Sequence, residues 1–260
     1  MIPLRDDNPS YRFPLVTLIL IIVNCIVFVF TNLAGEAEYI RAMYTYGLIP
    51  AELLHGEVVT SLPQELLKTG IPHVVIGNVP PLLTMFTSMF LHGGWAHILG
   101  NMWFLWIFGD NVEDRMGHFR YLIFYIITGL IAGFAHSLAA NNSLVPSLGA
   151  SGAISGVIGA YIMLFPSANI QTLWFFFFFP QIINIPAMVY LGIWFLGQLW
   201  SGFADLGVSG AGIAFFAHIG GFLAGVVFYG IFASKRLVQI PEEDGSWSNY
   251  RHSGHDDIWY

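Results

Sequence analysis

Long apolar runs recur along this chain, and they constrain its fold more than any other feature. A helix that crosses a lipid bilayer needs roughly 20 predominantly apolar residues. Six segments meet or approach this length: 14–33, 82–109, 119–140, 149–166, 185–204 and 210–233. Because the bilayer core offers backbone groups no water, such segments are expected to be helices. The sequence therefore predicts an all-α membrane protein, with six transmembrane helices bundled in a domain at 14–233.

The composition agrees with a polytopic membrane protein and argues against other classes. Of the 260 residues, 56% are hydrophobic and only 10% are charged, whereas a soluble domain carries about 25% charged residues. The net charge of −7 reflects in large part an acidic C-terminal end, and the absence of a basic patch argues against nucleic acid as a partner. Cys25 is the only cysteine, so no internal disulfide forms. The lipid bilayer is the expected partner of the surface.

Lys and Arg are distributed unevenly around the six predicted spans. One side carries Arg5, Arg12, Arg115, Arg120, Lys235, Arg236 and Arg251, and the other side carries Arg41 and Lys68. Because these residues accumulate on the cytoplasmic side of membrane proteins, both termini are predicted to be cytoplasmic, in a cell (inner or plasma) membrane. Residues 1–13 then form a cytoplasmic N-terminus, and the loop 34–81 lies outside.

Two further segments on the predicted cytoplasmic side have distinct compositions. The loop 167–184 contains most of the run LWFFFFFPQIINIP, which favours aromatic anchoring at the membrane interface and a turn that ends at proline. Residues 234–260 are polar and acidic and lack an apolar period. They are predicted to form a disordered cytoplasmic tail.

Polar side chains inside three predicted spans are the strongest functional signal. Such residues are costly in hydrocarbon and usually serve a function. His97 and Asn101 share a helix face near the start of the second span, because they are four residues apart. Ser151 lies near the start of the fourth span, and His218 lies within the sixth. These three spans run from outside to inside, so all four side chains are predicted in the outer half of the bilayer.

This coincidence of depth favours nucleophilic catalysis. A serine is a weak nucleophile unless a neighbouring base takes its proton, and His218 can act on Ser151 if their two spans are in contact. Small residues at the contact allow close approach of the two backbones; they are Gly152, Gly156, Gly221 and Gly225. The helix N-terminus at Ser151, with His97 and Asn101, supplies donors for a developing oxyanion.

Other interpretations of these residues are weaker. A small-residue motif alone is common in membrane helices, and an isolated histidine such as His136 is expected to be structural. His118 is expected at the cytoplasmic surface, in contact with solvent. The pair His92 and His97 suggests a metal site, but neither acids nor cysteines lie nearby to complete a ligand set. No metal and no other cofactor is therefore expected.

Taken together, these residues resemble the rhomboid family of intramembrane serine proteases. The motifs that carry the resemblance are HGGWAHILGN at 92–101, GDNVEDRMG at 109–117, GASG at 149–152 and AHIGG at 217–221. They extend the likeness over all six spans. The resemblance implies a bundle of the rhomboid type that cleaves transmembrane proteins.

The family resemblance also implies a role for each matching residue. Ser151 is the implied nucleophile and His218 the implied base, while His97 and Asn101 line the oxyanion hole. His92 supports that hole from behind. Glu113 is implied to be structural, at the cytoplasmic turn after the second span. Some members carry a tyrosine one turn after the nucleophile, which stacks on the histidine, but Ser155 stands there in this chain. What orients His218 is left open.

The sequence thus predicts a serine endopeptidase that cleaves transmembrane substrates at or just within the outer membrane face. A Ser–His dyad is expected rather than a triad, because most acids lie on the wrong side and only Asp205 is near a span on the outer side. An inactive relative that binds membrane clients is the first alternative, and a transporter is the second. The sequence specifies neither the substrate nor the oligomeric state.

Overall fold

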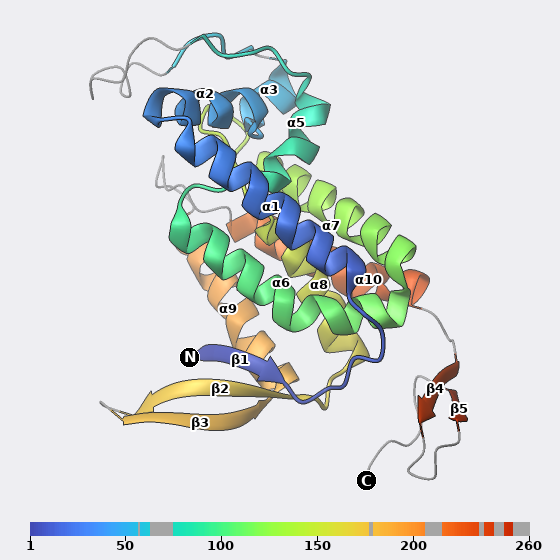
Figure 1. The fold of residues 1–260 in the computed structure, drawn as a ribbon. Coiled ribbons are helices and arrows are strands. Elements are labelled where there is room, and N and C mark those ends of the chain that lie inside the picture. The colour runs from blue at the N-terminus through green and yellow to red at the C-terminus, as the bar shows by residue number, and fades with distance from the viewer. Residues whose placement is uncertain are drawn as a thin grey trace.

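The chain forms a bundle of helices with a small sheet at one end (Figure 1). The computed structural model describes residues 1–56, 58–62, 75–176, 179–205, 215–233, 237–241 and 247–251. The long helices are α1 (Leu15–Leu33), α6 (Trp95–Met116), α7 (His118–Ala139), α8 (Ser151–Leu164), α9 (Ala187–Asp205) and α10 (Phe215–Phe232). We call the end that carries the strands β1 to β3 the inner end and the opposite end the outer end.

Three of the described helices are long and apolar enough to cross a membrane, namely α1, α7 and α10. Helix α8 and the part of α9 at Ala187–Ser201 are apolar but shorter. A mostly helical membrane protein is therefore confirmed, whereas the count of six spans stays a prediction. Each of the six predicted spans nevertheless overlaps one of the helices named above.

The second predicted span, 82–109, differs most from the structure. It is divided into α5 (Pro81–Thr87), the short 3₁₀ helix η1 (Ser88–Phe90) and α6, with an irregular segment at 91–94 between them. Two glycines in this segment break the helix. Helix α6 then continues seven residues beyond the predicted end, to Met116. The break places the polar end of α6 directly beside the outer loop.

Helix α8 lies at the centre of the bundle, and its residues from Gly152 to Tyr161 are all buried. A Cβ atom on Gly221 of α10 would overlap the carbonyl oxygen of Gly152, and one on Gly225 would overlap that of Gly156. The predicted glycines therefore do lie at the contact between α8 and α10. The absence of these side chains lets the two backbones touch, which fixes the first residues of α8 and α10 side by side.

Glu113 fastens the inner ends of α6 and α1. Its carboxylate is 1% exposed and accepts hydrogen bonds from the backbone N–H groups of Val16 and Thr17, each at 2.8 Å, and from the Thr17 hydroxyl at 2.7 Å. These two N–H groups belong to the first turn of α1, where they have no intrahelical partner. His118 is exposed, as expected, and its Nδ1 lies 2.5 Å from the same carboxylate. Glu113 therefore acts as a helix cap between segments distant in sequence.

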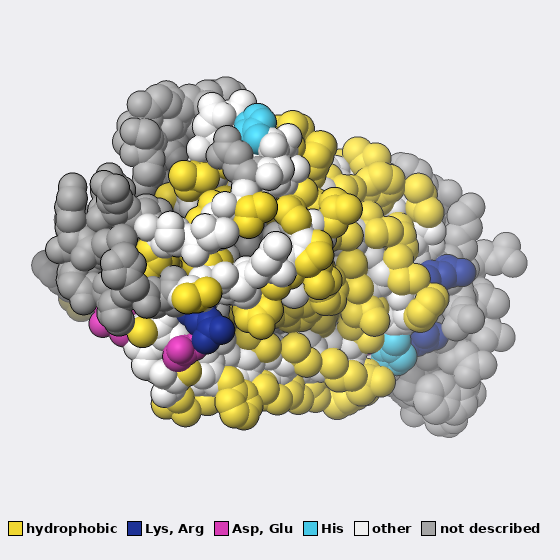
Figure 2. Space-filling view, turned by 90° about the horizontal axis from the view of Figure 1, so that it is seen from above, with side chains coloured by type: hydrophobic (Ala, Val, Ile, Leu, Met, Phe, Trp, Pro, Cys, Tyr) yellow, Lys and Arg dark blue, Asp and Glu magenta, His cyan; other side chains and the backbone are white. Residues whose placement is uncertain are grey.

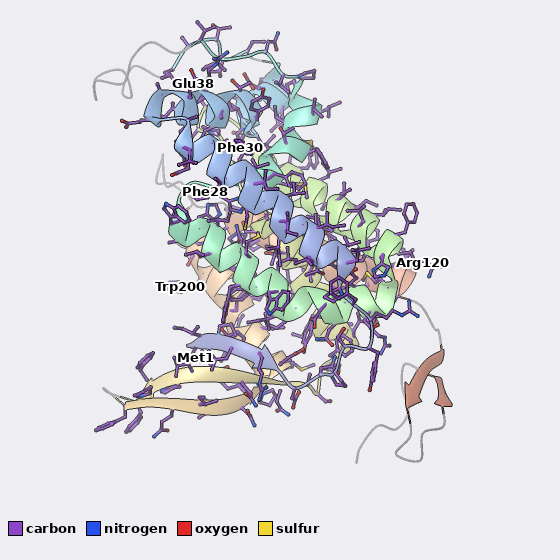
Figure 3. The ribbon with its side chains drawn as sticks, in the orientation of Figure 1. Met1, Phe28, Phe30, Glu38, Arg120 and Trp200 are labelled. Carbon is purple, nitrogen blue, oxygen red and sulfur yellow. The ribbon has the colours of Figure 1, made fainter. Side chains whose placement is uncertain are left out.

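An antiparallel sheet of three strands occupies the inner end: β1 (Ile2–Asp6), β2 (Asn169–Phe176) and β3 (Phe179–Pro186), in that order. The prediction of a simple turn at 167–184 was therefore wrong. Ile, Thr and aromatic residues favour strands, and the third strand comes from the N-terminus, with Ile2 opposite Leu173. Figure 3 shows Met1 beside this hairpin.

The outer end is covered by α2 (Glu36–Tyr46) and α3 (Pro50–His55), within the predicted outer loop. They share a small apolar cluster of Tyr44, Ile49, Leu62 and Ile76. At the other extreme of the chain, the segment predicted to be disordered contains two paired strands, β4 (Leu237–Pro241) and β5 (Trp247–Arg251). The remainder of that tail lies outside the described residues.

The flanks of the bundle are apolar. Figure 2, seen from above, shows hydrophobic side chains over most of the described surface and only a few charged ones. On α1, Phe28 is buried and contacts Trp95, whereas Phe30 is 74% exposed; Figure 3 labels both. Exposed apolar side chains continue along this helix at Ile19, Ile22, Val23, Ile26, Val29 and Leu33. Such a surface suits contact with lipid rather than water.

Candidate active site

Ser151 and His218 meet across the contact between α8 and α10. Ser151 is the first residue of α8 and His218 is in the first turn of α10. The Ser151 Oγ lies 2.8 Å from the His218 Nε2. This is the distance at which a hydroxyl donates a hydrogen bond to an imidazole, so the arrangement suits proton transfer from serine to histidine.

A glutamine from a third helix holds the other side of the imidazole. The Nδ1 of His218 lies 2.7 Å from the Oε1 of Gln198 on α9. One turn earlier on the same helix, the Trp194 ring lies 6.2 Å from the His218 ring, centre to centre. Sequence reasoning missed both residues. The one feature that could have drawn attention to this position is a glutamine inside an apolar span, since buried amides need hydrogen-bond partners.

His97 and Asn101 come from the first two turns of α6 and face the segment just before Ser151. The backbone N–H of Gly93 donates to the Nδ1 of His97 at 3.2 Å. In a neutral imidazole the second nitrogen, Nε2, then carries the proton and is a donor. That Nε2 lies 2.7 Å from where a Cβ on Gly149 would be, and the Asn101 Nδ2 lies 3.6 Å from the same point. Two side-chain donors therefore converge two residues before Ser151.

The glycine at 149 is required by this geometry in two ways. Its φ of +124° is a conformation that residues with a side chain rarely adopt. A side chain there would also collide with the His97 ring. The GASG motif therefore places a bare backbone against the donors of α6 and then starts a helix at its third residue. The first N–H groups of that helix have no intrahelical acceptors, so they are further donors at this end of α8.

His92 lies behind this group, in the irregular segment before α6. Its side chain is fully buried, and its ring packs edge-on against His97 with the ring centres 5.1 Å apart. The Tyr39 hydroxyl donates to its backbone carbonyl at 3.1 Å. Among the described residues, the Asn101 Nδ2 has no hydrogen-bond partner. The structure thus brings all five predicted site residues to the outer end.

A small cavity of about 30 Å³ opens beside the nucleophile. Ser151, Gly149, Ser88, Ser147 and Leu48 contribute to its wall. A cavity needs roughly 10–15 Å³ of such space to hold a water molecule, so this one has room for water. Leu48 comes from the outer loop, and its backbone pairs with that of Ser147. The outer loop therefore helps to shape the site.

Two remaining residues have structural contacts. Ser155, which replaces the stacking tyrosine, donates its hydroxyl to the backbone carbonyl of Ser151 at 2.7 Å, so it does not orient His218. His136 on α7 is half-buried, and its Nδ1 has no partner in the described part of the chain. The described residues contain no group of three or more His, Cys, Asp or Glu that fits a metal ion.

Ser151 and His218 are thus hydrogen-bonded between two apolar helices, and the side-chain donors of α6 lie beside the segment that leads to the serine. Comparison with known proteins agrees with the resemblance seen in the motifs. The family pattern described as Rhomboid domain matches residues 80–235. The chain belongs to the rhomboid family.

Three proteins with rhomboid names are similar in sequence to this chain. The chain is 34% identical over 162 residues to Rhomboid protein 1, mitochondrial, of Saccharomyces cerevisiae, covering 60% of this chain and 43% of that protein. It is 34% identical over 144 residues to Rhomboid protease GluP of Bacillus subtilis, covering 54% and 24%. Presenilin-associated rhomboid-like protein A, mitochondrial, of Danio rerio is 30% identical over 155 residues, covering 57% and 37%.

The chain thus spans less than half the length of these relatives.

The names of these relatives also give information on where in the cell they are found. Two of the three are mitochondrial by name and one is a bacterial protease. The rhomboid family and the apolar helices support a membrane location, but the relatives do not support the predicted cell membrane.

Proposed function

We propose that the chain is a six-span intramembrane serine endopeptidase, which cleaves transmembrane proteins near the outer membrane face with Ser151 and His218. The hydrogen bond of 2.8 Å between Ser151 Oγ and His218 Nε2 carries this proposal. It joins two helices that bare glycines bring together, at the end of the bundle where the outer loop lies. The uneven distribution of Lys and Arg supports the orientation, with both termini on the inner side.

The reaction follows from the positions of these groups. His218 Nε2 accepts the hydroxyl proton while the Ser151 Oγ attacks the scissile carbonyl carbon. The carbonyl oxygen becomes an oxyanion, which His97 Nε2–H, Asn101 Nδ2–H and the N-terminal N–H groups of α8 stabilise. When the intermediate collapses, the C–N bond breaks and His218 returns its proton to the leaving amine. Water then attacks the acyl-serine with His218 as base, releasing the acid and restoring Ser151.

Hydrolysis inside a membrane requires water and an accessible peptide bond. The cavity beside Ser151 has room for one water, and it lies at the end of the bundle covered by α2 and α3. A substrate helix hides its carbonyl groups in hydrogen bonds, so it has to unwind before the attack. Substrates are therefore expected to enter laterally from the bilayer and to carry small or helix-breaking residues near the cleaved bond.

Labelling with a fluorophosphonate probe tests the proposal directly. The purified full chain in detergent is expected to react covalently, because only an activated serine attacks such a probe. Ser151→Ala should not react, whereas Ser137→Ala should react normally, since Ser137 lies on α7 and bonds its own helix at Gly133. Absence of labelling in the folded parent would favour the alternative, a rhomboid-like protein that binds membrane clients without cutting them.

Co-expression with a panel of tagged single-span proteins then identifies substrates. Cleavage products that appear with the parent chain and disappear with Ser151→Ala would establish endopeptidase activity. Transport of a solute that persists in Ser151→Ala would instead support the second alternative, a transporter that uses the same polar cavity.

A further inference from the structure

We propose that Gln198 is a positioning residue that sets the tautomer and orientation of His218. The proposal rests on the function proposed above. Gln198 Oε1 lies 2.7 Å from His218 Nδ1, and Ser151 Oγ lies 2.8 Å from His218 Nε2. The imidazole is therefore held at both nitrogens, by side chains from two different helices.

The choice of atoms fixes where the protons lie. An amide oxygen accepts hydrogen bonds and does not donate them, so Nδ1 must carry the ring proton. In the neutral ring Nε2 is then an acceptor, which is the state that takes the proton from the Ser151 hydroxyl. The uncharged amide thus performs the orienting task that a carboxylate performs in a Ser–His–Asp triad. A neutral partner also avoids placing an anion within the bilayer.

The position of Gln198 links the dyad to the packing of α9. Phe195 on α9 stacks on Phe222 of α10, with the ring centres 4.2 Å apart. This contact seats α9 beside the helix that carries His218. Movement of α9 away from α10 would remove Gln198 from Nδ1, and His218 would lose its fixed tautomer. The dyad is therefore fully assembled only while α9 is packed on α10.

Two substitutions separate the hydrogen bond from the shape of the side chain. Gln198→Met keeps the length but removes the acceptor, and Gln198→Glu keeps an acceptor. We expect Gln198→Met to lower kcat about tenfold to a hundredfold with little change in KM, and to slow fluorophosphonate labelling in parallel. Gln198→Glu should retain more activity than Gln198→Met. Leu196→Met is the control on the same helix, because Leu196 is 63% exposed, and it should match the parent.

The outcomes distinguish this inference from the proposed function. A Gln198→Met variant with parental kcat and parental labelling would overturn the inference alone, provided that Ser151→Ala is inactive. Equal losses in Gln198→Met and Gln198→Glu would also overturn it, because the acceptor would then not matter. Cleavage that persists in Ser151→Ala would overturn the proposed function itself.

A second inference rests on a different observation, the pattern of side chains on the β2–β3 hairpin. Near its base, Ile170 and Thr172 are fully buried against the bundle, while the opposite face carries Asn169, Gln171 and Asn184. Farther out, the described side chains on both faces are mostly apolar and exposed, with Gln181 as a polar exception. Phe179 is 71% exposed on the first face, and Ile182 is 63% exposed on the second.

We infer that the outer half of this hairpin inserts into the headgroup region of the lipid leaflet at the inner end of the bundle. Figure 1 shows the hairpin extending sideways beyond the outline of α6 and α9. No residue from 169 to 186 is charged, and Trp174, 39% exposed, is of the type enriched at membrane interfaces. Because β3 runs directly into α9 at Ala187, an anchored hairpin would hold the inner end of α9 in place.

The positions of the polar groups beside the hairpin support contact between its apolar half and lipid. Arg5 of β1 donates to Gln171 at 2.8 Å on the polar face, so charge gathers at the base and away from the apolar half. Trp103 of α6 donates its indole N–H to the backbone of Pro3 at 2.7 Å. The base is thus fastened to the bundle, and the apolar half extends from it along the membrane surface.

Single-cysteine labelling of the full chain in nanodiscs tests this inference. In a Cys25→Ser background, a polarity-sensitive fluorophore is attached at Phe179→Cys or, as the matched control, at Asn184→Cys on the same strand. Nitroxide-labelled lipid should quench the probe at 179 several-fold more than the probe at 184, and aqueous iodide should show the reverse order. Ile182→Cys repeats the test if Phe179→Cys fails to fold.

Two results would overturn the lipid assignment. Efficient iodide quenching at both positions would place the hairpin in water. Protection at 179 that is insensitive to nitroxide lipid and rises with protein concentration would identify a second copy of the chain as the occupant. Neither readout depends on proteolysis, so this test is independent of the proposed function.

Discussion

Two buried polar clusters lie at opposite ends of this bundle, and they differ in how completely their hydrogen bonds are made. At the inner end Glu113 accepts hydrogen bonds from Val16 and Thr17 and contacts His118. At the outer end the Asn101 Nδ2 has no partner among the described residues. Glu113 and Asn101 are both buried, and of the two only Asn101 retains an unused donor.

This difference distinguishes an inner cluster that stabilises the fold from an outer cluster that serves the proposed reaction. Buried polar groups in proteins are almost always paired, because an unpaired one costs free energy. The Glu113 carboxylate follows that rule and joins α1 to α6. The outer cluster departs from it at the place where an oxyanion would need donors. Groups that lack a partner in the resting protein can gain one in the transition state, and this is how differential stabilisation arises.

The largest expected effect is on the nucleophile at the outer end. Ser151→Ala should lower cleavage by about 10⁶-fold, as removal of a catalytic serine does elsewhere. The melting temperature should stay near that of the parent, because one hydroxyl is removed from a small-residue site. Cleavage of a transmembrane substrate and thermal unfolding in detergent measure the two quantities. A folded Ser151→Ala protein that cleaves at the parental rate would remove the serine-protease assignment.

The two asparagines of α6 offer a matched comparison between the ends. Asn101→Ala should reduce kcat by roughly 10²–10³-fold if its amide is a main oxyanion donor, with little loss of stability. Asn111 lies at the inner end and bonds Asp6 and Asn8. Asn111→Ala should therefore lower the melting temperature and leave kcat of the folded protein nearly unchanged. If the two variants behave alike, the contrast between the clusters fails.

Glu113→Gln should show the opposite pattern to Ser151→Ala. The amide presents one oxygen and one NH₂ group to three donors from Val16 and Thr17, so donors come to face donors. The free energy of unfolding should fall by about 2–4 kcal/mol, seen as a lower melting temperature. The rate of fluorophosphonate labelling per folded molecule should stay within a few-fold of the parent. A selective loss of labelling at unchanged stability would contradict the structural role of Glu113.

The sequence alone predicted the residues of the outer cluster but not all of their contacts. Ser151, His97, Asn101 and His218 were recognisable because polar groups in apolar runs are rare and their depths coincide. The capping of α1 by Glu113 was not predicted, since it joins segments almost 100 residues apart.

The same limitation explains the other differences. The sheet at the inner end depends on pairing Ile2 with Leu173, which local periodicity does not reveal. Gln198 was overlooked because a neutral amide in an apolar run gives no indication of its partner. Helix α6 begins later than expected because two adjacent glycines outweigh the apolar composition around them. Local composition thus predicts elements and depth, whereas contacts between distant segments require the structure.

Asp205→Asn should have the smallest effect of these changes. It is the acid that ends α9, and it was the one candidate for a third member of a catalytic triad. Gln198 already occupies the Nδ1 side of His218. Position 205 lies seven residues farther along the helix, roughly 10 Å at 1.5 Å per residue. We therefore expect Asp205→Asn to retain kcat/KM within about tenfold of the parent, whereas loss of a triad carboxylate costs roughly 10⁴-fold. Gln198→Met measured in the same assay should be the more damaging of the two. A loss near 10⁴-fold in Asp205→Asn, with folding intact, would mean that Asp205 and not Gln198 orients His218 during the reaction.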